Sequence, residues 1–261
     1  MTTIEIKKKT YQVPATWNEL SAAQLLNIFI ALNNPNYKPE EQLLKLFKVV
    51  VGISSFTWAG LKVEDYEEYI YLTGFLFDKK INFTKQLLPV YENMYGPADD
   101  LENLLGSELV LTDHYYQQWE ADRQNMDHLN HLVAVLYRPA KPKYDFALNP
   151  DGDCRVAFNE NVTAWAADNI IASWPLHVKQ AIAYWYAGCR QQIVDQYPDV
   201  FGGSGEPARY GMLSILRSIA KTGTHGTLEQ VEKLPIGLIM IELDETVDEG
   251  KKMEEQMKKP Q

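Results

Sequence analysis

The chain has 261 residues, of which 46% are hydrophobic and 23% charged, as expected for a globular protein of one large domain or two smaller ones. Its formal net charge of −10 argues against general nucleic-acid binding, which requires clustered Lys and Arg. Two cysteines, Cys154 and Cys189, provide neither a disulfide framework nor metal-ligand spacing. The charged N-terminus does not resemble a signal peptide, and no segment approaches the roughly 18 apolar residues of a membrane span. We therefore expect a soluble cytoplasmic protein with no nucleic-acid or membrane partner.

The first hundred residues predict a small β element followed by helices. Residues 4–13 alternate apolar and polar side chains around three consecutive lysines, a pattern typical of a hairpin or of an edge strand that charges protect. Ser21 and Gln24 form a capping box, which predicts a helix that begins there. Further helices are expected at about residues 40–51 and 64–77, and short helical turns at 82–95.

A long helix is expected from about Thr112 to Leu136. Its apolar side chains recur in steps of four and three residues, the spacing of a coiled-coil seam. One polar residue, Asp122, interrupts this seam. The seam consists of Tyr115, Trp119, Asp122, Met126, Leu129, Val133 and Leu136. Pro139 follows as a stop signal.

A β-hairpin insert is expected after this helix, near residues 144–158. The strand-like runs 144–148 and 154–158 flank Asn149-Pro150-Asp151-Gly152, whose composition is typical of a tight turn. A hairpin that protrudes from a helical body exposes its turn. Asp151 and Gly152 are therefore candidate partner contacts.

Helical patterning resumes after the insert. Helices are expected after a cap at Asn159 or Asn161, from Trp174-Pro175, from about Tyr210 to Gly223, and from Pro235 onward. The second of these has an apolar stripe that consists of Val178, Ile182, Trp185, Cys189 and Ile193. Such a stripe is typical of a helix face buried in a core.

These elements predict a mainly α fold. We expect a helical bundle with a small N-terminal β element and a β-hairpin insert near 144–158. The polar loop around residue 100 predicts two helical subdomains, 1–100 and 107–261, or one continuous domain if the loop is only a connection.

His128 and His131 lie three residues apart on the expected long helix, next to Asp127. Two imidazoles and a carboxylate can bind a divalent metal, so a helical metal-dependent enzyme is one hypothesis. However, no Glu-x-x-His pair is present, and no second helix supplies matching ligands. A solvated polar face is the preferred interpretation, and we expect no catalytic residues, metal or cofactor.

The last helix is acidic. Glu242, Asp248 and Glu249 suit docking on a basic partner, although a solvated helix face is the default interpretation of such a pattern. Asp151-Gly152-Asp153 has the beginning of a calcium loop but lacks the later oxygen ligands and the closing Glu, so a turn is expected there.

Three segments resemble tailed-bacteriophage morphogenesis proteins, in particular tail-assembly-chaperone-like proteins. They are residues 11–21 with the amphipathic helix that follows, residues 132–158 with their Leu-Tyr-Arg-Pro sequence, and residues 210–243. The resemblance implies a non-enzymatic protein that binds other phage proteins during tail assembly. It implies a location in the cytoplasm of the bacterial host and is compatible with a place in the virion. The tape measure and the tail tube are the partners it implies.

A second binding hypothesis is a phage accessory protein that acts on a host system. Both binding hypotheses require only an interaction surface. The sequence therefore leaves them open, together with the choice of partner and the oligomeric state.

Overall fold

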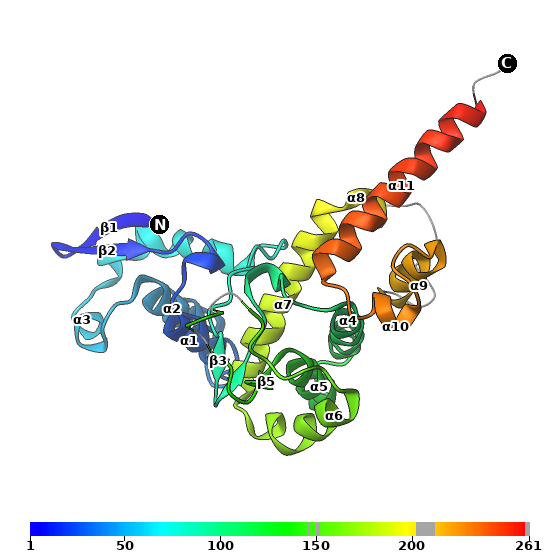
Figure 1. Cartoon of the computed structure of the whole chain (residues 1–261). Helices are drawn as coiled ribbons and strands as arrows, with labels where there is room; N and C mark the ends of the chain where they lie inside the picture. The colour runs from blue at the N-terminus through cyan, green and yellow to red at the C-terminus, as the bar shows by residue number, and fades with distance from the viewer. Residues whose placement is uncertain (146, 150–151, 202–211, 259–261) are drawn as a thin grey trace. The chain divides into compact units, whose positions relative to one another are not determined.

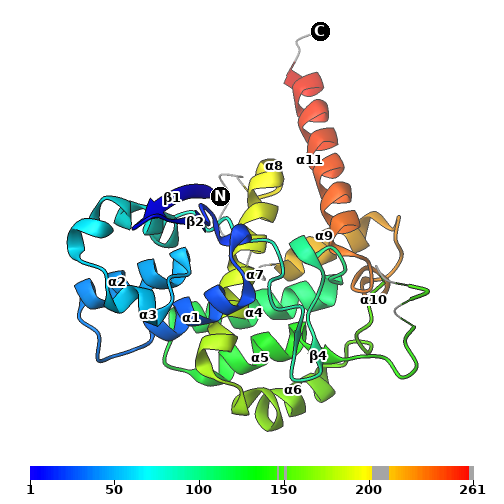
Figure 2. The same cartoon turned by 90° about the vertical axis from the view of Figure 1, so that its left-hand side faces the viewer.

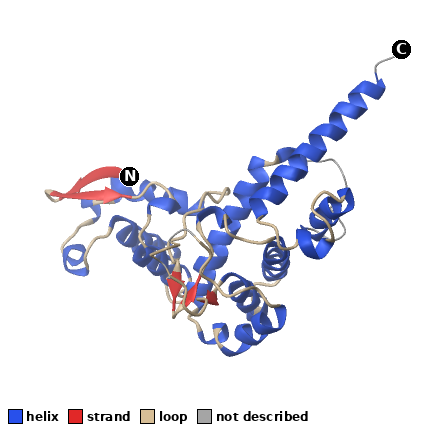
Figure 3. Ribbon diagram, viewed as in Figure 1, coloured by secondary structure: helices blue, strands red, loops and turns tan. Residues whose placement is uncertain are grey.

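The computed structural model describes residues 1–145, 147–149, 152–201 and 212–258. The described chain is mainly α with two small sheets (Figures 1 and 3), which confirms the predicted fold class. It divides into two compact units. Unit 1 comprises residues 1–88 and 174–191, and unit 2 comprises residues 89–173 and 192–261. No helix in the described part of the chain is both long enough and apolar enough to cross a membrane.

Unit 1 begins with the predicted hairpin. Strands β1 (Thr2–Ile6) and β2 (Lys9–Val13) pair antiparallel with Ile6 opposite Lys9. Lys7 and Lys8 form the two-residue turn at φ +46° and +63°, the left-handed values that a type I′ hairpin turn requires. Two of the three lysines therefore make the turn itself.

The helical elements of unit 1 follow the predicted order. They are η1 (Trp17–Glu19), α1 (Ala22–Leu32), α2 (Pro39–Val51), α3 (Ser55–Ala59), η2 (Val63–Asp65), η3 (Glu67–Phe77) and the first part of α7 (Leu176–Gln196). The capping box is confirmed, because Ser21 Oγ accepts from the Gln24 backbone at 3.2 Å and Gln24 Oε1 accepts from the Ser21 backbone at 2.9 Å. The single helix predicted at 64–77 is wrong. Tyr66 leaves helical geometry at φ −142° and packs its ring against Phe47 and Trp58, which divides the segment into two 3₁₀ helices.

The core of unit 1 is aromatic. Trp17 packs against Phe83 and Tyr184, with ring centroids 5.7 and 4.7 Å away, and its indole donates to the Phe75 carbonyl at 3.2 Å. On α7, the indole of Trp185 donates to the Thr84 carbonyl at 2.8 Å. The predicted stripe of this helix is confirmed, since Val178, Ile182, Trp185, Cys189 and Ile193 are all buried.

Unit 2 contains a three-stranded sheet where helical turns were expected. Strands β3 (Val90–Tyr91) and β4 (Met94–Tyr95) form a hairpin, and β4 also pairs with β5 (Arg138–Pro139). Glu92 and Asn93 adopt φ +46° and +64°, again the type I′ turn. The prediction of helical turns at 82–95 is therefore wrong for residues 90–95. Their β-branched and aromatic side chains favour strands once a partner strand is present.

The helices of unit 2 are η4 (Asp99–Leu101), α4 (Gly106–Ala121), α5 (Met126–Leu136), α6 (Glu160–Asn169), η5 (Ile171–Ser173), α8 (Pro198–Phe201), α9 (Met212–Thr222), α10 (Leu228–Val231) and α11 (Ile236–Lys258). Helix α5 packs against α4 and against α6 (Figures 1 and 2). Of the two candidate caps, Asn159 and Asn161, the structure has Asn159, and the predicted helix end at Gly223 is confirmed. Asn159 Oδ1 accepts from the Val162 backbone at 3.2 Å, and Gly223 ends α9 at φ +77°.

The predicted long helix with a continuous seam is wrong. Helix α4 ends at Ala121, and α5 begins at Met126. Asp122 Oδ1 accepts from the Gln124 backbone at 3.1 Å, and Asn125 Oδ1 accepts from the Asp127 backbone at 3.1 Å. Such side chain to backbone hydrogen bonds compete with helix formation. Asp122 lies between the helices, and the other seam residues lie on two helices that pack against each other.

The insert after α5 is a hairpin whose paired arms are 139–141 and 154–156. Lys141 donates its backbone N–H to Cys154 at 2.7 Å, and Val156 donates to Pro139 at 2.9 Å. The expected first arm, 144–148, forms turns in its described residues, because Asp145 Oδ1 accepts from the backbone of Ala147. Asp151 lies outside the described residues.

Candidate binding pocket

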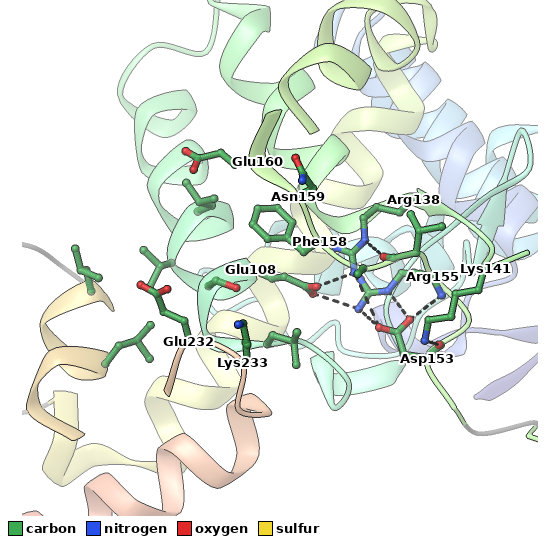
Figure 4. Close-up of a pocket in the computed structure, with 18 residues that line it drawn as sticks. Glu108, Arg138, Lys141, Asp153, Arg155, Phe158, Asn159, Glu160, Glu232 and Lys233 are labelled. Atoms are coloured by element: carbon green, nitrogen blue, oxygen red, sulfur yellow. Dashed lines mark hydrogen bonds and ion pairs between the residues drawn. The ribbon is translucent and has the colours of Figure 1, made fainter. Parts of the chain in front are cut away.

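A largely buried cluster of charges lies in unit 2 (Figure 4). Glu108 has no exposed surface and accepts from two arginines, Arg138 Nη2 at 2.7 Å and Arg155 Nη2 at 3.3 Å. Asp153 accepts from Arg155 through Nε at 2.9 Å and Nη2 at 3.0 Å. The two carboxylates formally balance the two guanidinium groups.

Backbone interactions position each member of the cluster. Glu108 lies in the first turn of α4, where Gly106 and Ser107 donate their N–H groups to the carbonyls of Leu234 and Glu232. A Cβ at Gly106 would lie 2.7 Å from Ile239 Cδ1 and 3.3 Å from the Val231 carbonyl oxygen, so a larger residue would require the Ile239 side chain to move. Pairing of β5 with β4 fixes Arg138, and the returning arm of the hairpin carries Arg155.

The arginines also donate to main-chain carbonyls. Arg138 Nε donates to Val156 at 2.9 Å and its Nη1 to Val135 at 2.8 Å. Arg155 Nη1 donates to Leu136 at 3.0 Å. These bonds tie α5 to the hairpin insert. Buried guanidinium groups need such partners, because desolvation without them is costly.

Burial and neighbouring charges shift two ionisation equilibria. Burial lowers the pKa of Arg138, the charge of Arg155 lowers it further, and Glu108 acts in the opposite direction. Burial alone would raise the pKa of Asp153, but hydrogen bonds from Arg155 and its charge outweigh that effect and hold the pKa below its ordinary value. The lowered pKa keeps the carboxylate of Asp153 ionised at neutral pH, where it pairs with Arg155.

A pocket of about 740 Å³ extends from this cluster across unit 2. Its apolar wall is formed by Leu105, Val110, Leu111, Phe158, Leu213 and Leu216. Glu160 and Glu232 also line the pocket, and in Figure 4 they lie away from the arginine cluster. Small-molecule and side-chain binding pockets typically combine an apolar wall with a few polar groups and have volumes of roughly 300–1,000 Å³. The volume of this pocket falls within that range.

The structure places the predicted metal candidates on α5, away from this pocket's lining. His131 donates from Nδ1 to the Asp127 carbonyl at 2.8 Å, and its ring lies against Tyr115 with the centroids 4.9 Å apart. Asp127 is exposed, and His128 is half-buried. No group of three or more His, Cys, Asp or Glu side chains with metal-binding geometry occurs among the described residues.

The predicted partner contacts on the last helix lie on α11. Glu242 Oε1 lies 3.0 Å from His225 Nε2, and Asp248 lies 3.9 Å from Lys252. Asp248 and Glu249 are exposed. Gly152, the described member of the predicted turn pair, is half-buried.

The pocket residues were missed in the sequence. Glu108 is 30 positions from Arg138 and 47 from Arg155, and nothing in the local pattern connects them. One signal was available. Arg138 directly follows the continuous apolar run 132–137, and a charge at the end of a buried segment needs a buried partner.

Comparisons with known proteins add no relative. No protein-family model matches the sequence, and neither the curated proteins nor the solved structures contain a match.

Proposed function

We propose that this chain is a non-enzymatic protein that binds other phage proteins during tail assembly in the cytoplasm of a bacterial host. The sequence resemblance to tail-assembly-chaperone-like proteins supplies the biological setting. The tape measure and the tail tube are the proposed partners.

The pocket of unit 2 is the observation that carries the proposal. Its buried charges are held by one another and by main-chain carbonyls, which suits a rigid surface that recognises another protein. Its apolar wall is partly exposed at Leu111, Phe158 and Leu213, and carboxylates that can orient a partner line the same pocket.

Helix α11 offers a second contact surface. Leu238 and Ile241 are 37% and 50% exposed, and Glu245 and Asp248 continue the same helix face at steps of four and three residues. An apolar patch followed by acidic side chains suits a partner with apolar and basic groups.

Gene deletion combined with affinity capture tests the proposal. We expect the deletion to reduce the number of complete tails seen by electron microscopy, and tagged full-length chain to capture an identified tail protein from infected cells. Normal tails after deletion, together with no captured tail protein, would refute it.

A further inference from the structure

The pocket of unit 2 has two chemically different ends. At one end lie the paired side chains of Glu108, Asp153 and the two arginines (Figure 4). At the other end Glu160 and Glu232 contribute carboxylates that have no ion-pair partner among the residues the structure describes. Side chains of α4, α9 and the hairpin insert form the apolar wall.

The cationic groups that line the pocket already have partners. Lys233 pairs with Glu229 at 2.9 Å, and Lys141 donates to the Asp153 carbonyl at 2.7 Å. The arginines pair with Glu108 and Asp153 as described above. The ammonium of Lys141 keeps its charge, because the carbonyl that it contacts is neutral, but in Figure 4 it lies with the arginine cluster. At the opposite end Glu160 and Glu232 have no such cation paired with them in the described part of the chain, and they give that end of the pocket a negative potential.

We propose that this pocket binds a peptide segment of a partner protein in which a large apolar side chain lies next to Lys or Arg. The apolar side chain would contact Leu111, Leu213 and their neighbours, and the cation would pair with Glu160 or Glu232. The proposal rests on the proposed function and names the chemistry of the partner segment.

Physical arguments favour this occupant over an acidic or purely apolar one. An acidic segment would meet two like charges at Glu160 and Glu232. A purely apolar segment would cover these carboxylates without replacing their lost hydration. A cationic amphipathic segment avoids both costs, since its charge compensates theirs while its apolar side chain covers the exposed wall.

Fluorescein-labelled synthetic peptides test the preference directly. The first peptide is Gly-Lys-Leu-Phe-Lys-Gly, the second has Glu in place of both lysines, and the third has Ser in place of Leu and Phe. Fluorescence anisotropy with the full-length chain is expected to show saturable binding of the first peptide. Its affinity should be about tenfold higher than that of the second peptide, which lacks the charge contacts, or of the third, which lacks the apolar contact. Equal binding of the Lys and Glu peptides, or no saturable binding of the Lys peptide, would overturn the proposal.

Variants assign the binding to the pocket. Glu160→Gln with Glu232→Gln should reduce the preference for the Lys peptide to less than about threefold, because exposed ion pairs each contribute modestly. The matched control, Glu64→Gln with Glu67→Gln, removes two exposed carboxylates of unit 1 and should leave the preference unchanged. Leu111→Trp should block the apolar wall and weaken binding of the Lys peptide about tenfold. If Leu111→Trp does not fold, the Glu160→Gln, Glu232→Gln variant and its control still decide whether the peptide binds in the pocket.

The same variants separate this inference from the proposed function. If wild-type chain captures a tail protein and the Glu160→Gln, Glu232→Gln variant captures it equally well, the pocket inference is wrong and the proposed function stands. If wild-type chain captures no tail protein, the proposed function fails whatever the peptides show. If wild-type chain captures a tail protein and the pocket variant does not, the result supports both the proposed function and the pocket inference.

Discussion

Replacing Glu108 by Gln removes the charge that two buried arginines share. Glu108 is fully buried and accepts at 2.7 Å from Arg138 and at 3.3 Å from Arg155, so the substitution leaves two guanidinium groups with Asp153 as their nearest compensating carboxylate. Removing one partner of a buried ion pair typically costs about 3–5 kcal/mol. Since total stabilities are about 5–15 kcal/mol, a loss of that size would leave unit 2 close to unfolding.

The assay must resolve the two units, because separate units can unfold in separate transitions. Hydrogen–deuterium exchange followed by mass spectrometry meets this need. Peptides from α4 and from the hairpin insert should lose protection in Glu108→Gln, while peptides from α1 and α2 keep theirs. Glu64→Gln, an exposed carboxylate in unit 1, is the matched control and should change stability by less than about 0.5 kcal/mol.

The double variant Glu108→Leu with Arg138→Met checks the mechanism. The pair of Glu108 and Arg138 is then removed from both sides, while Arg155 keeps Asp153 as its partner. The cost should therefore be smaller than the sum of the Glu108→Leu and Arg138→Met costs by about 1–3 kcal/mol. Additive costs, or a Glu108→Gln cost below about 1 kcal/mol, would refute the claim that these groups form one buried charge network.

Two further predictions concern pH and packing. Because folding lowers the pKa of Asp153, its carboxylate contributes stability above its unfolded pKa of about 3.9, and this contribution is lost as pH falls through the folded value. The free energy of unfolding of unit 2 is measured at decreasing pH for wild type and for Asp153→Asn. The difference between the two should become smaller below about pH 4, and a difference that does not change with pH would contradict the pairing of Asp153 with Arg155. In unit 1, a Cβ at Gly188 would lie 2.8 Å from the Phe83 carbonyl carbon, whereas a Cβ at Gly74 meets nothing within 4 Å. Thermal unfolding should show Gly188→Ala to be less stable by about 1–3 kcal/mol and Gly74→Ala to be unaffected or slightly more stable, and equal effects would contradict the close approach.

Local signals in the sequence predicted the elements that depend on local interactions. The Ser21 and Gln24 capping box and the helix end at Gly223 involve residues close in sequence, and both were predicted correctly. The Asn159 cap was one of two candidates that the sequence offered. The apolar stripe of α7 was also predictable, because one buried helix face leaves a regular pattern.

The features that the sequence did not predict depend on side chains that compete with helix formation or on partners far away in the sequence. Asp122 and Asn125 fit the heptad spacing, but their side chains bind nearby N–H groups and break the helix. Strands β3 and β4 have only two residues each, too few for a periodic signal, and require β5 from more than 40 positions away. The charge cluster joins three segments in the same way, so no local pattern could indicate it.

Affinity capture from infected cells tests the central claim most directly. Tagged full-length chain is expressed during infection, and the proteins it retains are identified and quantified by mass spectrometry against a tag-only control. The tape measure or the tail tube protein should be enriched with the wild-type chain. Infected cells that form tails while neither protein nor any other tail component is enriched would contradict the claim that this chain binds phage proteins during assembly.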